Sequence, residues 1–129
     1  MITEKKIIGL LQFQLPLIAW CVFVYTASSI PSPNIPALGT YTDKVIHFGV
    51  YGILCWLAHI AFHHQSNISL KKYSLLAAMI FTIVFGLSDE FHQLYTPGRT
   101  AELLDIAADT LGGAVYSTIY LRFRFYKNG

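Results

Sequence analysis

Long apolar segments are the feature that most restricts how this chain can fold. Crossing the hydrocarbon core of a bilayer, about 30 Å thick, takes about 20 mostly apolar residues in a helix. Segments of roughly this kind cover residues 7–25, 45–62, 73–88 and 103–121. With 54% apolar and only 12% charged residues, the 129-residue chain has too few polar side chains to face water on all sides. We therefore predict an all-α protein, a single membrane domain (residues 1–129) built as a four-transmembrane-helix bundle.

The positions of the basic residues predict how this bundle lies in the membrane. Cytoplasmic loops retain an excess of Lys and Arg. Seven of the nine bases fall before the first segment, between the second and third, and after the fourth: Lys5, Lys6, Lys71, Lys72, Arg122, Arg124 and Lys127. Both termini are therefore expected in the cytoplasm, and the connections 26–42 and 89–100 on the outer face. The basic residues thus indicate topology and no nucleic-acid partner. A cleavable signal peptide is the alternative for the first segment, but its apolar core is long for one.

Proline, glycine and cysteine add local expectations. Three prolines within six residues exclude a continuous helix from the first outer connection, and Pro16 predicts a kink in the first helix. The Pro97-Gly98 pair predicts a turn that holds Arg99 near the acidic residues or near a phosphate or carboxylate head group. Cys21 and Cys55 lie in mid-segment and are expected to be core residues.

Acidic residues gather on the side opposite these cytoplasmic bases. Six of the seven belong to the outer half, namely Asp43, Asp89, Glu90, Glu102, Asp105 and Asp109, and the only bases there are Lys44 and Arg99. Six acids against two bases leave a local charge of −4 with histidine neutral. This imbalance is the main functional signal in the sequence.

Helical spacing indicates which of these side chains meet. Asp43, His47 and Tyr51 follow one another at intervals of four residues, Asp105 and Asp109 are four apart, and Gln93 follows Asp89 at the same interval. Solvated loop charges suit Glu102, but a carboxylate at mid-helix, such as Asp109, costs roughly 2.5–3.5 kcal/mol on insertion scales unless it faces a partner. An interhelical ion-pair network is the second interpretation, with Asp43 or Asp105 bound to Lys44 or Arg99.

Neither interpretation accounts for the surplus of acids. Closely packed carboxylates must hold protons or share a cation. That cation is either an amine on a bound molecule or a divalent metal, for which Asp43, His47, Glu90 and Asp105 are the candidate ligands. No spacing here is a defined metal motif, so a metal remains one candidate among these.

Three blocks of these residues resemble the VanZ-like family of small bacterial membrane proteins. The blocks are "DKVIH", "DEFHQ" with a following "PGR", and "DIAADTLGG". The match covers Asp43, Lys44, His47, Asp89, Glu90, Gln93, Pro97, Gly98, Arg99, Asp105 and Gly112. Asp109 stands where the family pattern usually has Asn. The resemblance implies a multi-pass protein of the bacterial cytoplasmic (inner) membrane, and the family's namesake is associated with reduced susceptibility to teicoplanin.

Two functions follow as hypotheses. In the first, an outer acidic pocket binds an envelope lipid, a cell-wall precursor head group or a glycopeptide-type antibiotic, through Asp43, Lys44, His47, Asp89, Glu90, Gln93, Arg99, Asp105 and Asp109. In the second, a metal-assisted hydrolase or transferase acts on a lipid phosphate or ester, although no nucleophile motif is present. A homo-oligomer or a membrane partner protein stays open, and so does the question of enzymatic activity.

Overall fold

The chain folds almost wholly into helices. The computed structural model describes residues 4–35, 39 and 41–128, and these described residues contain no strand. The elements in chain order are α1 (Glu4–Gly9), the π-helical turn η1 (Leu10–Gln14), α2 (Leu15–Ser28), the 3-10 turn η2 (Ser32–Asn34), α3 (Thr42–His63), α4 (Ile68–Lys72), α5 (Ser74–Gln93) and α6 (Leu103–Asn128). The all-α class predicted from the sequence is confirmed.

Three of these helices are long and apolar enough to cross a membrane: Ile7–Ser28, which joins α1, η1 and α2, Thr42–His63 and Ser74–Gln93. Their outward faces carry large apolar side chains, among them Ile18, Val45 and Val84, each more than half exposed. Such a surface suits lipid and would be a liability in water. The fourth predicted span, α6, is a helix of 26 residues, but it is not among the three candidates because Asp105 and Asp109 lower its mean hydropathy.

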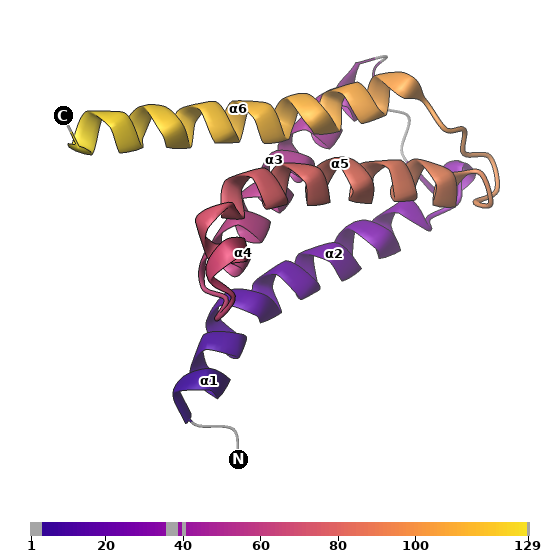
Figure 1. Cartoon of the computed structure of the whole chain (residues 1–129). Helices are drawn as coiled ribbons and strands as arrows, with labels where there is room; N and C mark the ends of the chain where they lie inside the picture. The colour runs from indigo at the N-terminus through magenta and orange to yellow at the C-terminus, as the bar shows by residue number, and fades with distance from the viewer. Residues whose placement is uncertain (1–3, 36–38, 40, 129) are drawn as a thin grey trace.

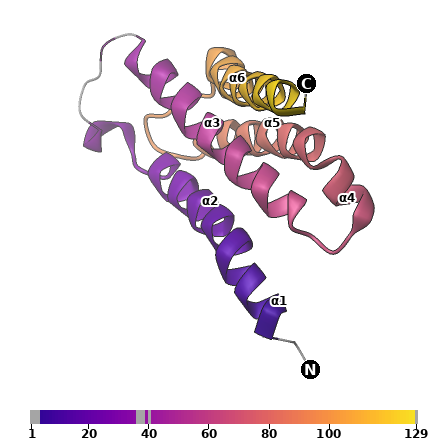
Figure 2. The same ribbon diagram turned by 90° about the vertical axis from the view of Figure 1, so that its left-hand side faces the viewer.

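Helix α3 lies at the centre of the bundle. It packs against α5 and α6, which also contact each other, and α2 contacts α3 and α5. Figures 1 and 2 show α6 running antiparallel to α5, and Figure 2 shows α3 lying between α2 and α6. The core is centred on α3, where Tyr51, Leu54, Cys55 and Ala58 are almost fully buried. Cys55 is thus a core residue as expected, and Cys21 is half-buried.

Two helices extend beyond the approximate spans expected for them. The third, expected over about 73–88 with a continuation through Glu90 left open, runs as α5 to Gln93, and Asp89, Glu90 and Gln93 lie on its buried face. Their polar atoms reach partners inside the protein, so their polarity does not end the helix. The fourth, expected to end at 121, continues as α6 to Asn128 with its last basic residues exposed.

The two proline-bearing segments also have a defined local structure. Just before Pro16 the helix widens into η1, and Figure 1 shows α1 turning away from the line of α2 there. Gln14 Nε2 donates a hydrogen bond to the Ala61 carbonyl at 2.8 Å, which ties this bend to α3. In the first connection the Ser32 amide donates to the Pro97 carbonyl at 3.1 Å. Pro36, the third proline of that connection, lies outside the described residues.

Glycines bring α3 and α6 into close contact. A Cβ on Gly112 would collide with the Phe48 carbonyl and lie 3.0 Å from the Gly52 amide nitrogen, and a Cβ on Gly52 would lie 3.3 Å from the Gly112 carbonyl oxygen. Small residues allow this backbone approach in membrane helices. The contact fixes the depth at which the acidic start of α6 faces α3.

We predict that Gly112→Ala destabilises the protein by about 1–3 kcal/mol, the usual range for overpacking. Gly49→Ala is the matched control, because it makes the same change on α3 where nothing lies within 4 Å of the new Cβ. Thermal unfolding in detergent measures both variants. A Gly112→Ala protein as stable as the Gly49→Ala protein would contradict this account of the contact.

Candidate functional site

All nine residues predicted for the site lie at one end of the bundle. There the N-termini of α3 and α6 meet the C-terminus of α5 and the turn that follows it (Figure 1). The tertiary structure therefore gathers residues that are up to 66 positions apart in sequence, from Asp43 to Asp109. They fall into two groups: a carboxylate cluster between α3, α5 and α6, and a cavity between α2, α3 and α5.

Lys44 is the centre of the carboxylate cluster. Its Nζ lies 2.9 Å from Asp43 Oδ2, 2.5 Å from Glu102 Oε2 and 2.6 Å from Asp105 Oδ1. The Lys44 side chain is 17% exposed and that of Asp105 only 7%, so the Lys44–Asp105 pair is largely shielded from solvent. One ammonium therefore compensates carboxylates from both α3 and α6. The interhelical network predicted from the sequence is confirmed for Lys44, and it includes Glu102, which was expected to be a loop charge.

His47, one turn further along α3, lies near Asp105 and also near Asp109. Its Nδ1 lies 2.9 Å from Asp109 Oδ1, and its Nε2 lies 4.0 Å from Asp105 Oδ2. The mid-helix carboxylate of Asp109, whose side chain is 1% exposed, thus has the inward-facing partner that its position requires. A Cβ on Gly86 would lie 2.8 Å from Asp109 Oδ2, so the absence of a side chain there makes room for the carboxylate.

Glu90 connects α5 to the start of α6. Its Oε2 accepts a hydrogen bond from the Glu102 amide at 2.7 Å, which satisfies a backbone donor at the N-terminus of α6. Glu90 is 3% exposed, and its Oε1 is buried without a hydrogen-bond partner among the described residues. The Oδ2 atom of Asp109 is likewise buried without a hydrogen-bond partner among the described residues.

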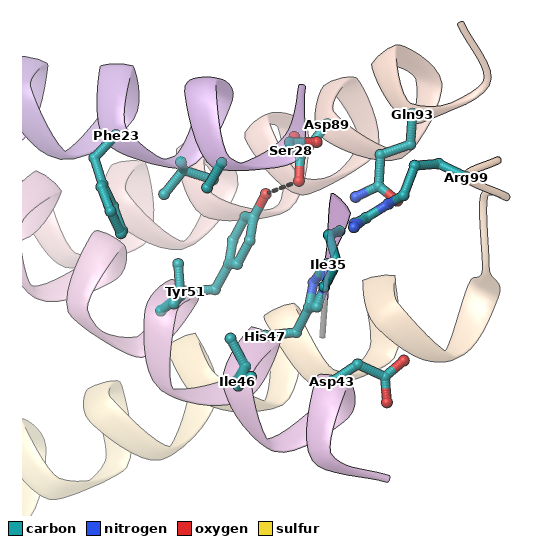
Figure 3. A pocket seen from close by; sticks show the side chains of 13 residues that line it. Phe23, Ser28, Ile35, Asp43, Ile46, His47, Tyr51, Asp89, Gln93 and Arg99 are labelled. Carbon is teal, nitrogen blue, oxygen red and sulfur yellow. Dashed lines mark hydrogen bonds between the residues drawn. The ribbon is translucent and has the colours of Figure 1, made fainter. Parts of the chain in front are cut away.

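The cavity has a volume of about 220 Å³ and lies on the other side of His47 and Tyr51. One wall is apolar and comes mainly from α2, with Phe23, Val24 and Ala27, joined by Ile35, Ile46 and Val50. The polar lining consists of Ser28, Asp43, His47, Tyr51, Asp89, Gln93 and Arg99. The Tyr51 hydroxyl donates to Asp89 Oδ2 at 3.1 Å (Figure 3). Ser28 Oγ and Asp43 Oδ1 are buried without a partner in the described part of the chain.

A tight turn holds Arg99 at this cavity. The Arg99 amide donates to the Thr96 carbonyl at 3.0 Å, and Gly98 has φ of 73°, which together fit a type II turn with Pro97 and Gly98 at its centre. The Arg99 side chain points toward the cavity beside Gln93 (Figure 3), and its Nε lies 3.4 Å from Gln93 Oε1. Within the described residues no carboxylate lies at ion-pair distance from Arg99, so the predicted Arg99 ion pairs are not formed.

Two groups of side chains have the spacing of metal ligands. His47, Glu90 and Asp105 form one, and Asp43, Glu102 and Asp105 the other. The second group surrounds Lys44 Nζ, whose positive charge already occupies its centre. Asp43, one of the four candidate metal ligands named from the sequence, therefore belongs to this second group, which we call the lysine site.

Sequence reasoning missed the α2 wall of the cavity. Helix α2 is apolar on every side, so no stripe of polar residues marks the face that turns toward α3. Ser28 was also left out of the predicted site. Tyr51 was placed on the Asp43–His47 stripe by its spacing but was not counted among the site residues.

The fold and site define a small helical protein with three candidate membrane spans and a shielded carboxylate cluster at one end. A family model described as VanZ/LLP1 matches residues 11–124. The chain belongs to this family. An uncharacterized protein of Schizosaccharomyces pombe is similar to it, with 29% identity over 109 residues, which is 84% of this chain and 59% of the relative. The chain thus spans less than two thirds of that relative. No solved structure matches it.

We predict that Lys44→Met destabilises the protein by about 3 kcal/mol, because it leaves the shielded Asp105 carboxylate without its cation. Adding Asp105→Asn to this variant recovers part of the loss by removing one of the stranded charges. Lys127→Met, an exposed change at the far end of α6, is the control. Unfolding in detergent micelles measures all three, and equal stability of the Lys44→Met and Lys127→Met proteins would refute the role of Lys44.

Proposed function

We propose that the protein is a four-span, multi-pass protein of the bacterial inner membrane, with both termini in the cytoplasm. Helix α6 supplies the fourth span, because 26 residues at 1.5 Å per residue extend about 39 Å, more than a hydrocarbon core. Its acidic residues are buried against α3 and α5 rather than turned to lipid. Lys71 and Lys72 lie in α4 and the bases of α6 near its C-terminus, a distribution that supports a cytoplasmic position for that end.

Cysteine labelling tests this topology. In a chain with Cys21 and Cys55 replaced by Ala, we expect a membrane-impermeant maleimide to label Thr100→Cys in intact spheroplasts. Ser66→Cys, in the connection between α3 and α4, is then labelled only after permeabilisation. Both positions are exposed, so access across the membrane is the main variable. The reverse labelling pattern would reject the proposed orientation.

We infer that the cavity binds the head group of a membrane amphiphile. The observation that carries this proposal is the division of the lining between an apolar wall from α2 and a polar side with both signs of charge. Arg99 has no carboxylate partner among the described residues, so its guanidinium is available to bind a phosphate. Asp43 and Asp89 line the same cavity and offer carboxylate oxygens to an amine. This combination fits a head group with a phosphate and an ammonium, as in an aminophospholipid.

The volume of the cavity distinguishes between the candidate ligands that the sequence left open. Pockets that enclose a drug-sized ligand measure roughly 300–1,000 Å³, so a cavity of about 220 Å³ suits a head group better than a whole glycopeptide. A lipid or the phosphate of a lipid-linked wall precursor is therefore the proposed ligand. Lower glycopeptide susceptibility, which we propose from the family resemblance, would then act through that lipid or precursor.

The hydrolase or transferase alternative lacks an activated side-chain nucleophile in the cavity. Ser28 and Tyr51 supply the hydroxyl groups among the lining residues, and Tyr51 already donates to Asp89. Ser28 Oγ has no hydrogen-bond partner in the described residues and thus no general base beside it. The same free hydroxyl suits a binding site, where it donates to a ligand oxygen.

Lipid binding by the purified protein tests the proposal. We expect Arg99→Ala to weaken retention of phosphatidylethanolamine and phosphatidylglycerol by about tenfold, because a charged hydrogen bond is worth about 1.5 kcal/mol or more. Asp43→Asn weakens retention of phosphatidylethanolamine alone, since only that lipid carries an amine. Native mass spectrometry from detergent measures both.

Arg122→Ala is the matched control, because it removes an exposed guanidinium from the opposite end of α6. Its lipid retention is expected to equal that of the unmodified protein. An Arg99→Ala protein that retains both lipids as well as this control does would show that the cavity is not the binding site.

A further inference from the structure

Two buried side chains and a half-buried one, from three different helices, converge beside the cavity. His47 on α3, Glu90 on α5 and Asp105 on α6 each offer one ligand atom, and these atoms all lie within 4.8 Å of one another. Exposure is 13% for the His47 side chain, 7% for that of Asp105 and 3% for Glu90. The lipid proposal uses neither Glu90 nor Asp105.

The orientation of the His47 ring leaves one nitrogen available to this group. With the Asp109 carboxylate oxygen Oδ1 at 2.9 Å, Nδ1 is placed to donate, and in the neutral ring Nε2 then offers its lone pair. Nε2 lies 4.0 Å from Asp105 Oδ2, too far for a hydrogen bond. Two ligands of one cation at about 2.1 Å each lie at most about 4.2 Å apart, so binding a shared ion would draw these two atoms closer by a fraction of an ångström. A carboxylate behind a metal-binding imidazole is the common way to fix its tautomer.

Glu90 supplies an independent observation. Its Oε2 is bound to the Glu102 amide, and its Oε1 is buried with no hydrogen-bond partner among the described residues. A buried carboxylate oxygen without a partner carries a desolvation cost of several kcal/mol when charged. A cation held between Glu90, His47 and Asp105 removes that cost.

The net charge of the buried side chains also favours a bound cation. Glu90, Asp105 and Asp109 are buried together, and Lys44 reaches only Asp105 among them. Lys44 also binds Asp43 and Glu102, so the three buried carboxylates keep a surplus of at least two negative charges when His47 is neutral. A divalent cation neutralises two of these charges.

We propose that His47, Glu90 and Asp105 bind a divalent transition-metal ion of the Zn²⁺ or Mn²⁺ type, with Asp109 as a positioning residue behind His47. One nitrogen and two carboxylate ligands favour these ions over Mg²⁺ and Ca²⁺, which prefer oxygen alone. The neighbouring group of Asp43, Glu102 and Asp105 is excluded because Lys44 occupies it. The site shares His47 with the cavity and otherwise lies on the carboxylate side of that ring, and metal binding requires no lipid.

Elemental analysis tests this site. Protein purified without a histidine tag is dialysed near neutral pH with ZnCl₂ or MnCl₂ and an excess of MgCl₂, which suppresses weak binding to surface carboxylates. We expect about one transition-metal ion per chain, as a single site with three protein ligands retains. Glu90→Gln and His47→Gln reduce this to background, and Asp109→Asn weakens binding by about 10–100-fold.

Glu102→Gln is the matched control, because it removes a carboxylate from the lysine site and leaves the proposed ligands in place. It is expected to retain the ion, and added ZnCl₂ or MnCl₂ is expected to raise Tm for this control but not for Glu90→Gln. Glu90→Gln keeps an oxygen acceptor for the Glu102 amide and removes a buried charge, so its metal-free Tm is expected to be no lower than that of the unmodified protein. An unmodified protein that retains no ion, or a Glu102→Gln protein that loses it while Glu90→Gln does not, overturns the proposal.

Discussion

The Lys44 ammonium is the interaction on which the acidic end of the bundle depends. Asp105 and Asp109 of α6 are buried next to the partly exposed Asp43 and Glu102, and without a cation these carboxylates would repel one another in a medium that screens charge poorly. Lys44 binds Asp43 on its own helix, Glu102 just before α6 and Asp105 within α6. The Glu102 amide in turn donates to Glu90 on α5. One cation and one backbone hydrogen bond therefore link three helix ends, and the glycine contact between α3 and α6 sets the distance over which they act.

His47 and Tyr51 separate two environments that differ in chemistry. On one side lies a cavity with an apolar α2 wall and Arg99 on its rim, and on the other lies the shielded carboxylate cluster. His47 belongs to both, because it lines the cavity and binds Asp109. A change in the cluster, such as metal binding, would therefore reach a ligand in the cavity through the His47 ring.

Much of the site follows from periodicity, and its failures have local physical causes. The Asp43–His47 and Asp105–Asp109 intervals place each pair on one helix face, and the Pro97-Gly98 turn positions Arg99 as expected. The sequence did not fix the end of α5, because polar residues suggest a loop when their interaction partners are unknown. The α2 wall was missed because a uniformly apolar helix does not mark its inner face.

The sequence by itself determined the all-α class, the apolar helices and the gathering of acids in one half of the chain, because these depend on local composition and helical period. Only the tertiary structure decided which acid meets which partner. Asp109 pairs with His47 although 62 residues separate them, and Lys44, not Arg99, neutralises the cluster. These choices depend on how closely α3 and α6 approach at Gly52 and Gly112. That distance is set by packing between helices, and no local pattern records it.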